Sequence, residues 1–249
     1  MKKFIFLLGG YDLEMLEIKK ILESVDNVTV FDKQLNWQNA HLSMYKDVLQ
    51  EQNNRNGVEI YGIELQETGF SPIPGNYHRI DHHNDFSSNP SSLEQVAAIL
   101  HIELSRKQQL IAANDKGYIP EMQKRGASPN EIEQIRFSDR EMQGVTEEDE
   151  QKAKEAIENK IEKQGIIVVK SETNRFSPIT DRLFPYEKLL IYTDDELMYY
   201  GQGKKDLAKN YEAEIKAGKM FHGGTARGVF SKEEIISLKE CIIQTIKKL

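Results

Sequence analysis

Residues 77–85 bring together side chains that bind metals and phosphates, in the order Tyr-His-Arg-Ile-Asp-His-His-Asn-Asp. His82 and His83 are adjacent, and the side chains of adjacent residues diverge, so one imidazole can bind a metal while the other meets a substrate. A neutral imidazole is a good ligand for Mn²⁺ or Zn²⁺, and a nearby carboxylate such as Asp81 can fix its tautomer. The alternative interpretation is a polar loop that holds two histidines by coincidence.

Acidic residues occur at the ends of other expected elements. Asp12 and Glu14 follow the first strand, Glu64 ends the third, and Asp115 follows a long apolar helix. Taken singly, each acid is an ordinary turn or capping residue. The carboxyl ends of parallel strands, however, meet at one edge of a sheet, where the ligands of open α/β sheets bind. We therefore expect the histidine pair and these acids to share one site.

Short apolar runs alternate with amphipathic stretches as far as about Asp115. This alternation predicts an α/β fold with a mostly parallel sheet and flanking helices in the N-terminal lobe, plus a smaller α/β C-terminal lobe. The expected domains are a metal-binding domain at 1–120, a helical connector at 121–164 and a smaller substrate-binding lobe at 165–249. The expected strands are 4–8, 28–31, 58–65, 77–81, 166–170, 189–193 and 197–201, and the expected helices are 13–23, 36–52, 93–110, 204–216 and 232–249, with two surface helices starting near Ser128 and Thr146.

The ordered set of motifs resembles the DHH phosphoesterase superfamily, which is named for the triplet that occurs here as Asp81-His82-His83. In that family a strand is followed by Asp-x-Asp, and a second acid, the triplet, a Ser-rich helix start and a single Asp come later. The counterparts in this chain are Asp12-Leu13-Glu14, Glu64, the triplet, Ser91-Ser92-Leu93-Glu94 and Asp115. The resemblance is fullest over residues 1–120.

This resemblance implies a two-metal site, usually holding Mn²⁺, in which the cations activate a water and neutralise a phosphoryl group during hydrolysis. The implied metal ligands are Asp12 for the first metal and Glu14, His82 and Asp115 for the second, with Glu64 bridging both. The resemblance also implies that His83 faces the substrate phosphate as the catalytic residue.

Two departures from the family bear on the number of metals. The family has a His four residues before its first Asp, whereas this chain has Leu8 there, so the first metal loses a ligand. Two family aspartates are replaced by Glu14 and Glu64, which are one methylene longer, and ligand distances of about 2.0–2.2 Å leave little slack. A variant with one metal or with altered metal binding is therefore the alternative.

A second candidate site lies at residues 222–228, His-Gly-Gly-Thr-Ala-Arg-Gly. Gly223 and Gly224 can turn backbone N–H groups toward an anion, and Arg227 can grip a phosphate. The family's C-terminal lobe has a similar glycine-rich loop with a His, although here His222 precedes the glycines. We expect these four residues to bind substrate; the alternative is a tight turn. The mixed-charge segment 138–144 is interpreted as a connector.

The composition limits the partners that the chain can bind, the cysteine sites that it can form and its expected location. The 249 residues carry 40 Asp+Glu against 33 Lys+Arg, a net charge of −7, which opposes broad attraction to duplex nucleic acid. Cys241 is the only cysteine, so disulfide frameworks and multi-cysteine metal sites are excluded. No apolar run approaches the roughly 20 residues of a membrane span, and no cleavage site follows the first run, so we expect a cytoplasmic protein.

The expected function is that of a metal-dependent phosphoesterase, a hydrolase that acts on a small phosphorylated or nucleotide substrate held between the lobes. The expected cofactor is a divalent metal, Mn²⁺, as one or two ions. One alternative is a non-catalytic module that binds a phosphoryl ligand on the same scaffold. Another is an oligonucleotide-trimming nuclease, which would need a basic cleft that the net charge disfavours.

Overall fold

A computed structural model describes residues 2–217, 220–222, 226–229 and 239–245. The chain divides into two compact units, Met1–Gln143 and Gly144–Leu249. This boundary falls inside the segment 121–164 that the sequence suggests as a connector.

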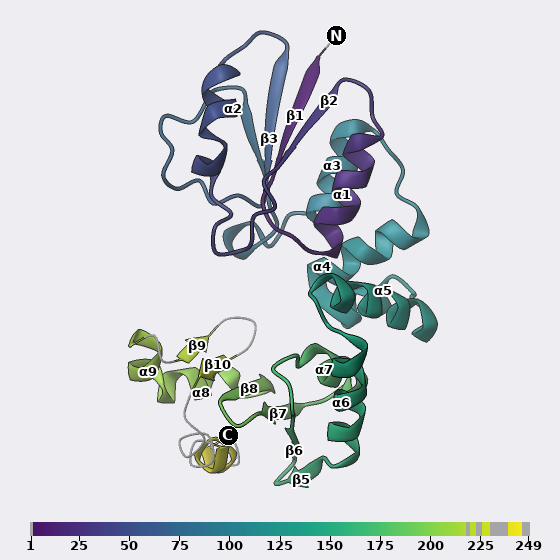
Figure 1. Cartoon of the computed structure of the whole chain (residues 1–249), viewed down its shortest axis with the longest axis vertical. Helices are drawn as coiled ribbons and strands as arrows, with labels where there is room; N and C mark the ends of the chain where they lie inside the picture. The colour runs from purple at the N-terminus through teal and green to yellow at the C-terminus, as the bar shows by residue number, and fades with distance from the viewer. Residues whose placement is uncertain (1, 218–219, 223–225, 230–238, 246–249) are drawn as a thin grey trace. The chain divides into compact units, whose positions relative to one another are not determined.

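The first unit is built on a four-stranded parallel sheet with the order β2-β1-β3-β4 (Figure 1). The strands are β1 (Lys3–Leu8), β2 (Val28–Asp32), β3 (Val58–Ile63) and β4 (Tyr77–Ile80), and each begins within one residue of its expected start. Parallel pairing with helices between the strands confirms the predicted α/β class. All four carboxyl ends therefore lie along one edge of the sheet.

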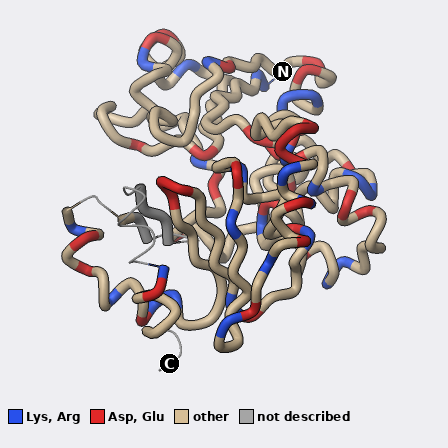
Figure 2. The backbone as a smooth tube through the Cα atoms, turned by 60° about the horizontal axis from the view of Figure 1, so that its bottom comes forward, with Lys and Arg blue, Asp and Glu red and all other residues tan. Residues whose placement is uncertain are grey.

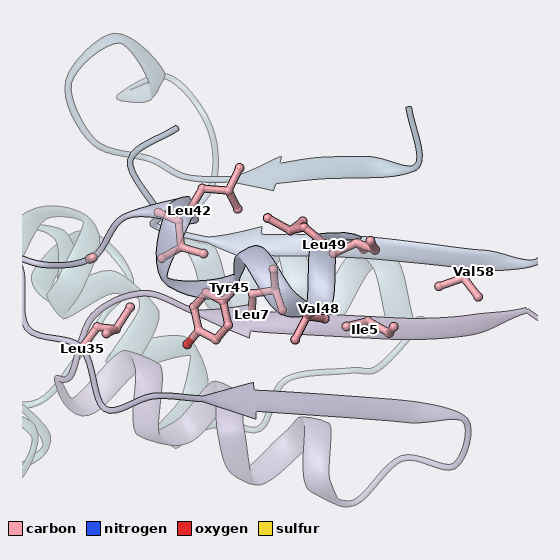
Figure 3. Packing of buried hydrophobic residues seen from close by; sticks show 11 residues of the cluster. Ile5, Leu7, Leu35, Leu42, Tyr45, Val48, Leu49 and Val58 are labelled. Atoms are coloured by element: carbon pink, nitrogen blue, oxygen red, sulfur yellow. The ribbon is translucent and has the colours of Figure 1, made fainter. Parts of the chain in front are cut away.

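Successive side chains of β1 point to opposite faces of this sheet, and side chains on both faces are buried. Ile5 and Leu7 point toward the side chains of the short helices η1 (Leu42–Tyr45) and α2 (Lys46–Glu51), as Figure 3 shows. The intervening Phe6 is fully buried as well, so it packs on the opposite face. A sheet with two covered faces suits a parallel arrangement.

Helices α1 (Leu13–Glu23) and α3 (Ser92–Leu100) pack against each other beside the sheet (Figure 1). The bounds of α1 are those predicted, and its expected apolar face, Met15, Ile18 and Leu22, is buried. Asp12 caps α1 by accepting a hydrogen bond from the backbone N–H of Met15 at 2.8 Å. The first strand and the first helix are thus joined by a residue of the predicted site.

The predicted helix over 36–52 is wrong in its first part. Residues 36–39 form a turn, and the helical stretch begins only at Leu42. The side chain of Asn36 accepts hydrogen bonds from the backbone N–H groups of Gln38 and Asn39, at 3.0 and 3.2 Å. Such local bonds give the backbone an alternative to a helix, which explains the error.

The predicted continuous helix over 93–110 is also wrong, because it is two helices. α3 ends at His101, which adopts a left-handed conformation with φ of 55°. α4 (Arg106–Lys124) starts afresh after Ser105, whose side chain forms a capping box with Gln108. Asp115 consequently lies within α4, two residues before a kink at Gly117, instead of following a helix.

The second unit contains a six-stranded mixed sheet with the order β5-β6-β7-β8-β10-β9. The three strands expected at 166–170, 189–193 and 197–201 are confirmed, and β7 and β8 pair as an antiparallel hairpin. The predicted helix over 204–216 is broken at Tyr211. Of the helix expected at 232–249, residues 239–245 are helical and the rest lies outside the described residues.

The helix starts expected near Ser128 and Thr146 are confirmed, since each of these residues caps a helix through a capping box. The remaining elements are η2 (Asn84–Phe86), α5 (Pro129–Met142), α6 (Glu147–Glu158), β5 (Ile161–Lys163), β6 (Ile166–Lys170), α7 (Ser177–Leu183), β7 (Lys188–Tyr192), β8 (Glu196–Gly201), α8 (Lys204–Asn210), α9 (Glu212–Lys216), β9 (Met220–His222) and β10 (Ala226–Val229).

Acidic and basic residues are interspersed along the backbone of both units (Figure 2). Among the described residues, no helix has the length and apolar character that crossing a membrane would require.

Candidate metal centre

The carboxyl ends of β1, β3 and β4 bring predicted site residues to one edge of the sheet. Glu64 directly follows β3, and His82 lies two residues beyond β4. Their approach to the end of β1 depends on Gly9, because a Cβ there would lie 2.3 Å from the carbonyl oxygen of Ile63 and 2.5 Å from that of Glu64. Only glycine lets these two strand ends pack so closely.

His82 is 5% exposed, and a carboxylate lies near each of its two ring nitrogens. Its Nε2 lies 2.8 Å from Oδ2 of Asp115, and its Nδ1 lies 3.6 Å from Oε1 of Glu64. Nδ1 also faces Ser92, 3.2 Å from the backbone nitrogen and 3.4 Å from the hydroxyl. The backbone N–H of Ser92 donates to Nδ1. A metal at Nε2 would instead require the ring proton on Nδ1, beside the Glu64 carboxylate and the Ser92 hydroxyl.

Three buried polar atoms of this region have no hydrogen-bond partner among the described residues: Oε2 of Glu14, Nε2 of His82 and Oδ2 of Asp115. Nε2 and Oδ2 are close, but they are not oriented to hydrogen-bond to each other. Buried polar atoms are nearly always bonded, so atoms such as these indicate a partner of another kind. An imidazole nitrogen and carboxylate oxygens form a donor set that suits Mn²⁺ or Zn²⁺.

The ligand atoms of four residues lie within 4.8 Å of one another and could hold a metal ion: Glu64, His82, His83 and Asp115. Three of them are predicted metal ligands. The fourth, His83, is the residue predicted to face the substrate. The predicted ligands Asp12 and Glu14 are outside this group, but their carboxyl groups interact electrostatically with Asp115 and Glu64.

Burial and mutual repulsion raise the pKa values of three carboxyl groups in this cluster. Burial, reinforced by the charges of Asp115 and Asp12, raises the pKa of Glu64 to about 8. Burial and the charge of Asp115 raise the pKa of Asp12 to about 6 and that of Glu14 well above its ordinary value. Ionised carboxylates are therefore unfavourable here without a compensating positive charge. A bound cation would supply that charge.

His83 is half exposed and is oriented by Asp81. Oδ1 of Asp81 accepts hydrogen bonds from the backbone N–H of His83 at 2.9 Å and from its Nδ1 at 3.2 Å. This contact raises the pKa of His83 to about 9, although its partial burial opposes the shift. Burial also opposes ionisation of Asp81, yet hydrogen bonds from His83 and Arg79 hold its pKa well below the usual range. This shift favours the imidazolium form of His83 at neutral pH when no cation is bound.

The first turn of α3 contributes contacts that the sequence does not reveal directly. The Ser92 hydroxyl donates to Oε1 of Glu64 at 2.6 Å. The backbone N–H of Leu93 donates to Oε1 of Glu14 at 3.2 Å, across 79 positions of sequence. The Ser-rich helix start at 91–94 was the available signal for this role, because a helix N-terminus favours negative charge.

A buried charged network behind Asp115 was missed. Nη1 of Arg136 donates to Oδ1 of Asn114 at 2.9 Å and to Oδ2 of Asp139 at 2.6 Å, and all three side chains are buried. The boundary between the two units falls within the segment 138–144, and most of that segment is the end of α5, where Asp139 and Arg140 are buried. The i,i+3 spacing of Arg136 and Asp139 was the available signal.

The remaining predicted residues are placed as follows. Leu8, at the position of the family's His, is a buried core residue of β1. In the second unit, His222 ends β9 and Arg227 lies in β10, opposite Phe221. Gly223 and Gly224 lie outside the described residues. The substrate-binding role of these four residues stays a prediction.

No protein-family model and no curated protein matches this chain. Solved structures do match. The DHH domain of a member of the s1p family of ribosomal proteins matches with a TM-score of 0.51 at 10% identity, over 99% of this chain and 87% of that one. A pGpG-specific phosphodiesterase from Vibrio cholerae matches over 99% of both chains, with a TM-score of 0.49 at 13% identity. RecJ from Thermus thermophilus in complex with Mn²⁺ matches over 99% of this chain and 52% of that one, with a TM-score of 0.49 at 10% identity.

The chain has the fold of a DHH-domain protein. This finding confirms the resemblance predicted from the Asp81-His82-His83 triplet. The low identity shows that the chain is a divergent example of this fold.

Proposed function

We propose that this chain is a metal-dependent phosphoesterase that hydrolyses a small phosphorylated or nucleotide substrate. The observation that carries the proposal is the convergence of two buried, unbonded ligand atoms, Nε2 of His82 and Oδ2 of Asp115, at the strand ends of a DHH-type sheet. This edge is where open α/β sheets bind their ligands.

The residues present fit one divalent cation better than two. His82, Asp115 and Glu64 supply an imidazole and two carboxylates within reach of one another, and Oε2 of Glu14 adds an unbonded buried oxygen nearby. Asp12 already uses Oδ1 to cap α1, and the family's additional His is Leu8. A bound cation, which we propose to be Mn²⁺, would act as a Lewis acid toward a phosphoryl oxygen and lower the pKa of a water.

His83 would stabilise the phosphoryl group directly. Its Nδ1 is engaged by Asp81, so Nε2 of the imidazolium is left to donate to an anionic oxygen. Donors placed where negative charge develops contribute about 10²–10³-fold to kcat in comparable sites. Ser92 and the N-terminus of α3 hold Glu64 and Glu14 in place by hydrogen bonds, so we assign them positioning roles.

The predicted loop around Gly223 and Gly224, with Arg227, remains our candidate for additional phosphate contacts. If Arg227 grips the substrate, Arg227→Ala raises KM for a phosphodiester and leaves the affinity for Mn²⁺ unchanged. An unchanged KM would remove the loop from the proposed site.

The second candidate function is binding of a phosphoryl ligand without hydrolysis. Leu8 favours it, because a core leucine occupies the position of a family metal ligand. Ligand-dependent stabilisation without turnover, with Mn²⁺, Mg²⁺ or Zn²⁺ present, would support this alternative and contradict the hydrolase.

The experiment that tests the proposal is hydrolysis of a dinucleotide and of a simple phosphodiester by the purified full chain with Mn²⁺. Product release is expected for wild type and is lost in His82→Ala. The matched control is His78→Ala, because His78 is an exposed histidine in β4 that pairs with Glu59 and lies outside the ligand group. Equal activity of His82→Ala and wild type would contradict the proposed site.

A further inference from the structure

Trp37 is the only tryptophan of the chain, and its side chain is left largely in solvent, 46% exposed. It lies in the turn at 36–39, and the turn is held by hydrogen bonds. The backbone N–H of Asn36 donates to Oδ1 of Asn39 at 2.7 Å, and that of Asn39 donates to the carbonyl oxygen of Asn36 at 3.0 Å. Hydrogen bonds therefore fix the backbone that carries the indole. A large apolar side chain held in solvent in this way is typical of a binding surface.

The indole lies beside the candidate metal centre. Its ring centroid is 5.7 Å from that of His83, edge to face, and the His83 ring is in turn 4.2 Å from the His82 ring. Gly10 makes room for it, since a Cβ on Gly10 would lie 2.6 Å from the indole. The three rings form a series that runs from a proposed metal ligand, through the proposed phosphate donor, to an exposed aromatic surface.

We propose that Trp37 is a specificity-determining residue that stacks on a nucleobase of the substrate, so that the site takes nucleotides in preference to phosphate esters without a base. This inference rests on the proposed function, because it places the phosphoryl group at His83. In a nucleotide the base is attached to the phosphoryl group through a sugar, so it would lie against a surface next to His83. The exposed indole of Trp37, which contacts His83, is such a surface. Stacking on an aromatic side chain accepts any base, because every base has a π-face.

The competing explanation is that Trp37 only covers Gly10 and the end of β1. A covering role needs only an apolar side chain that packs against Gly10, and it would not make the affinity differ between ligands with and without a base. A stacking role makes affinity depend on the presence of a base. The two explanations therefore differ in what Trp37→Ala does to two ligands that share a phosphate and a sugar.

The test uses adenosine 5′-monophosphate and ribose 5-phosphate as probes for the full chain with Mn²⁺. Because Trp37 is the sole tryptophan, quenching of its fluorescence reports the indole itself. We expect the adenine-bearing probe to quench this fluorescence and to bind roughly 5- to 100-fold more tightly than ribose 5-phosphate. Ribose 5-phosphate should bind with little quenching.

Calorimetric titration extends the test to variants. Trp37→Ala should bring the affinity for the nucleotide down to that for ribose 5-phosphate, whose affinity should not change, and Trp37→Phe should keep part of the difference. Met44→Ala, which removes another exposed apolar side chain of the same unit, should have no effect. Far-ultraviolet circular dichroism of each variant checks folding.

Two results would overturn the inference, and they are distinguishable. If both probes bind wild type with equal affinity and without quenching, the phosphoryl site stands but Trp37 does not stack on a base. If neither probe binds in the presence of Mn²⁺, the proposed phosphoryl site fails, and the inference fails with it.

Discussion

Nε2 of His82 and Oδ2 of Asp115 lie 2.8 Å apart, buried, and neither atom has a hydrogen-bond partner among the described residues. Two ligand atoms bound to one cation at about 2.0–2.2 Å are forced to a separation of roughly 3 Å without bonding to each other. The spacing of these two atoms therefore suits a shared divalent cation.

Divalent metal should stabilise the folded chain through these two atoms. A ligand present at about 100 times its Kd stabilises the native state by about 2.7 kcal/mol, so Mn²⁺ should raise the Tm. Asp115→Asn should remove most of this shift, whereas Asp26→Asn, at an exposed position, should retain it. The measurement is thermal unfolding with and without Mn²⁺, and an undiminished shift in Asp115→Asn would contradict the assignment.

The metal-free protein should lose stability as the pH rises from about 6 to 8. In the folded state the pKa of Glu64 is about 8, against an ordinary value of 4.5. The folded state thus keeps a proton that the unfolded state has released, so the free energy of unfolding falls as the pH rises through this window. His83, whose pKa is raised to about 9, contributes a slope of the same sign.

Two comparisons test this pH dependence. Glu64→Gln should flatten it, because glutamine can accept the Ser92 hydrogen bond but does not titrate. Mn²⁺ should weaken the dependence in wild type, because a cation competes with the proton. Chemical unfolding in EDTA at pH 6, 7 and 8 provides the measurement, and a stability that increases over this range would be the opposite of the expected sign.

Asp81→Asn should move the alkaline limit of activity. The Asp81 carboxylate raises the pKa of His83 to about 9, so in wild type the imidazolium persists across neutral pH. Removing that charge lets the pKa of His83 fall toward about 6.5, and kcat should then decline near neutral pH instead of near pH 9. The pH profile of kcat at saturating Mn²⁺ checks this, and a profile identical to wild type would show that His83 does not act as a cation.

Asp139→Ala should be strongly destabilising. It leaves the buried guanidinium of Arg136 without its carboxylate, and breaking one side of a buried ion pair costs about 3–5 kcal/mol. Glu121→Ala, which breaks the exposed pair with Lys124, should cost about 0–1 kcal/mol. Urea unfolding compares the two variants; a loss of less than about 1 kcal/mol in Asp139→Ala would contradict the structural role of this network.

The strands and the candidate site were predictable from the sequence for a physical reason. Buried parallel strands are continuous apolar runs, such as 4–8, and their carboxyl ends must meet at one edge. The acids that follow these runs, Asp12 and Glu64, therefore stand out. The helix starts at Ser128 and Thr146 were predictable as well, because capping is a local interaction with a sequence signature.

What the sequence did not reveal depends on contacts between distant residues or on weak local signals. The break between α3 and α4 lies within a stretch of continuous helical periodicity, and the Ser105–Gln108 capping box marks it. The Ser92–Glu64 hydrogen bond and the Trp37–His83 contact join segments that are far apart in the chain. Their pairing depends on the order of the strands, which periodicity does not specify.

The most direct measurement is the anomalous difference map of a crystal of the full chain soaked in Mn²⁺. We expect a peak within about 2.0–2.2 Å of both Nε2 of His82 and Oδ2 of Asp115. A second peak roughly 3.5–4 Å away would indicate a two-metal site despite Leu8. A map without a peak at these two atoms, with His82 and Asp115 hydrogen-bonded directly to each other, would contradict the metal centre.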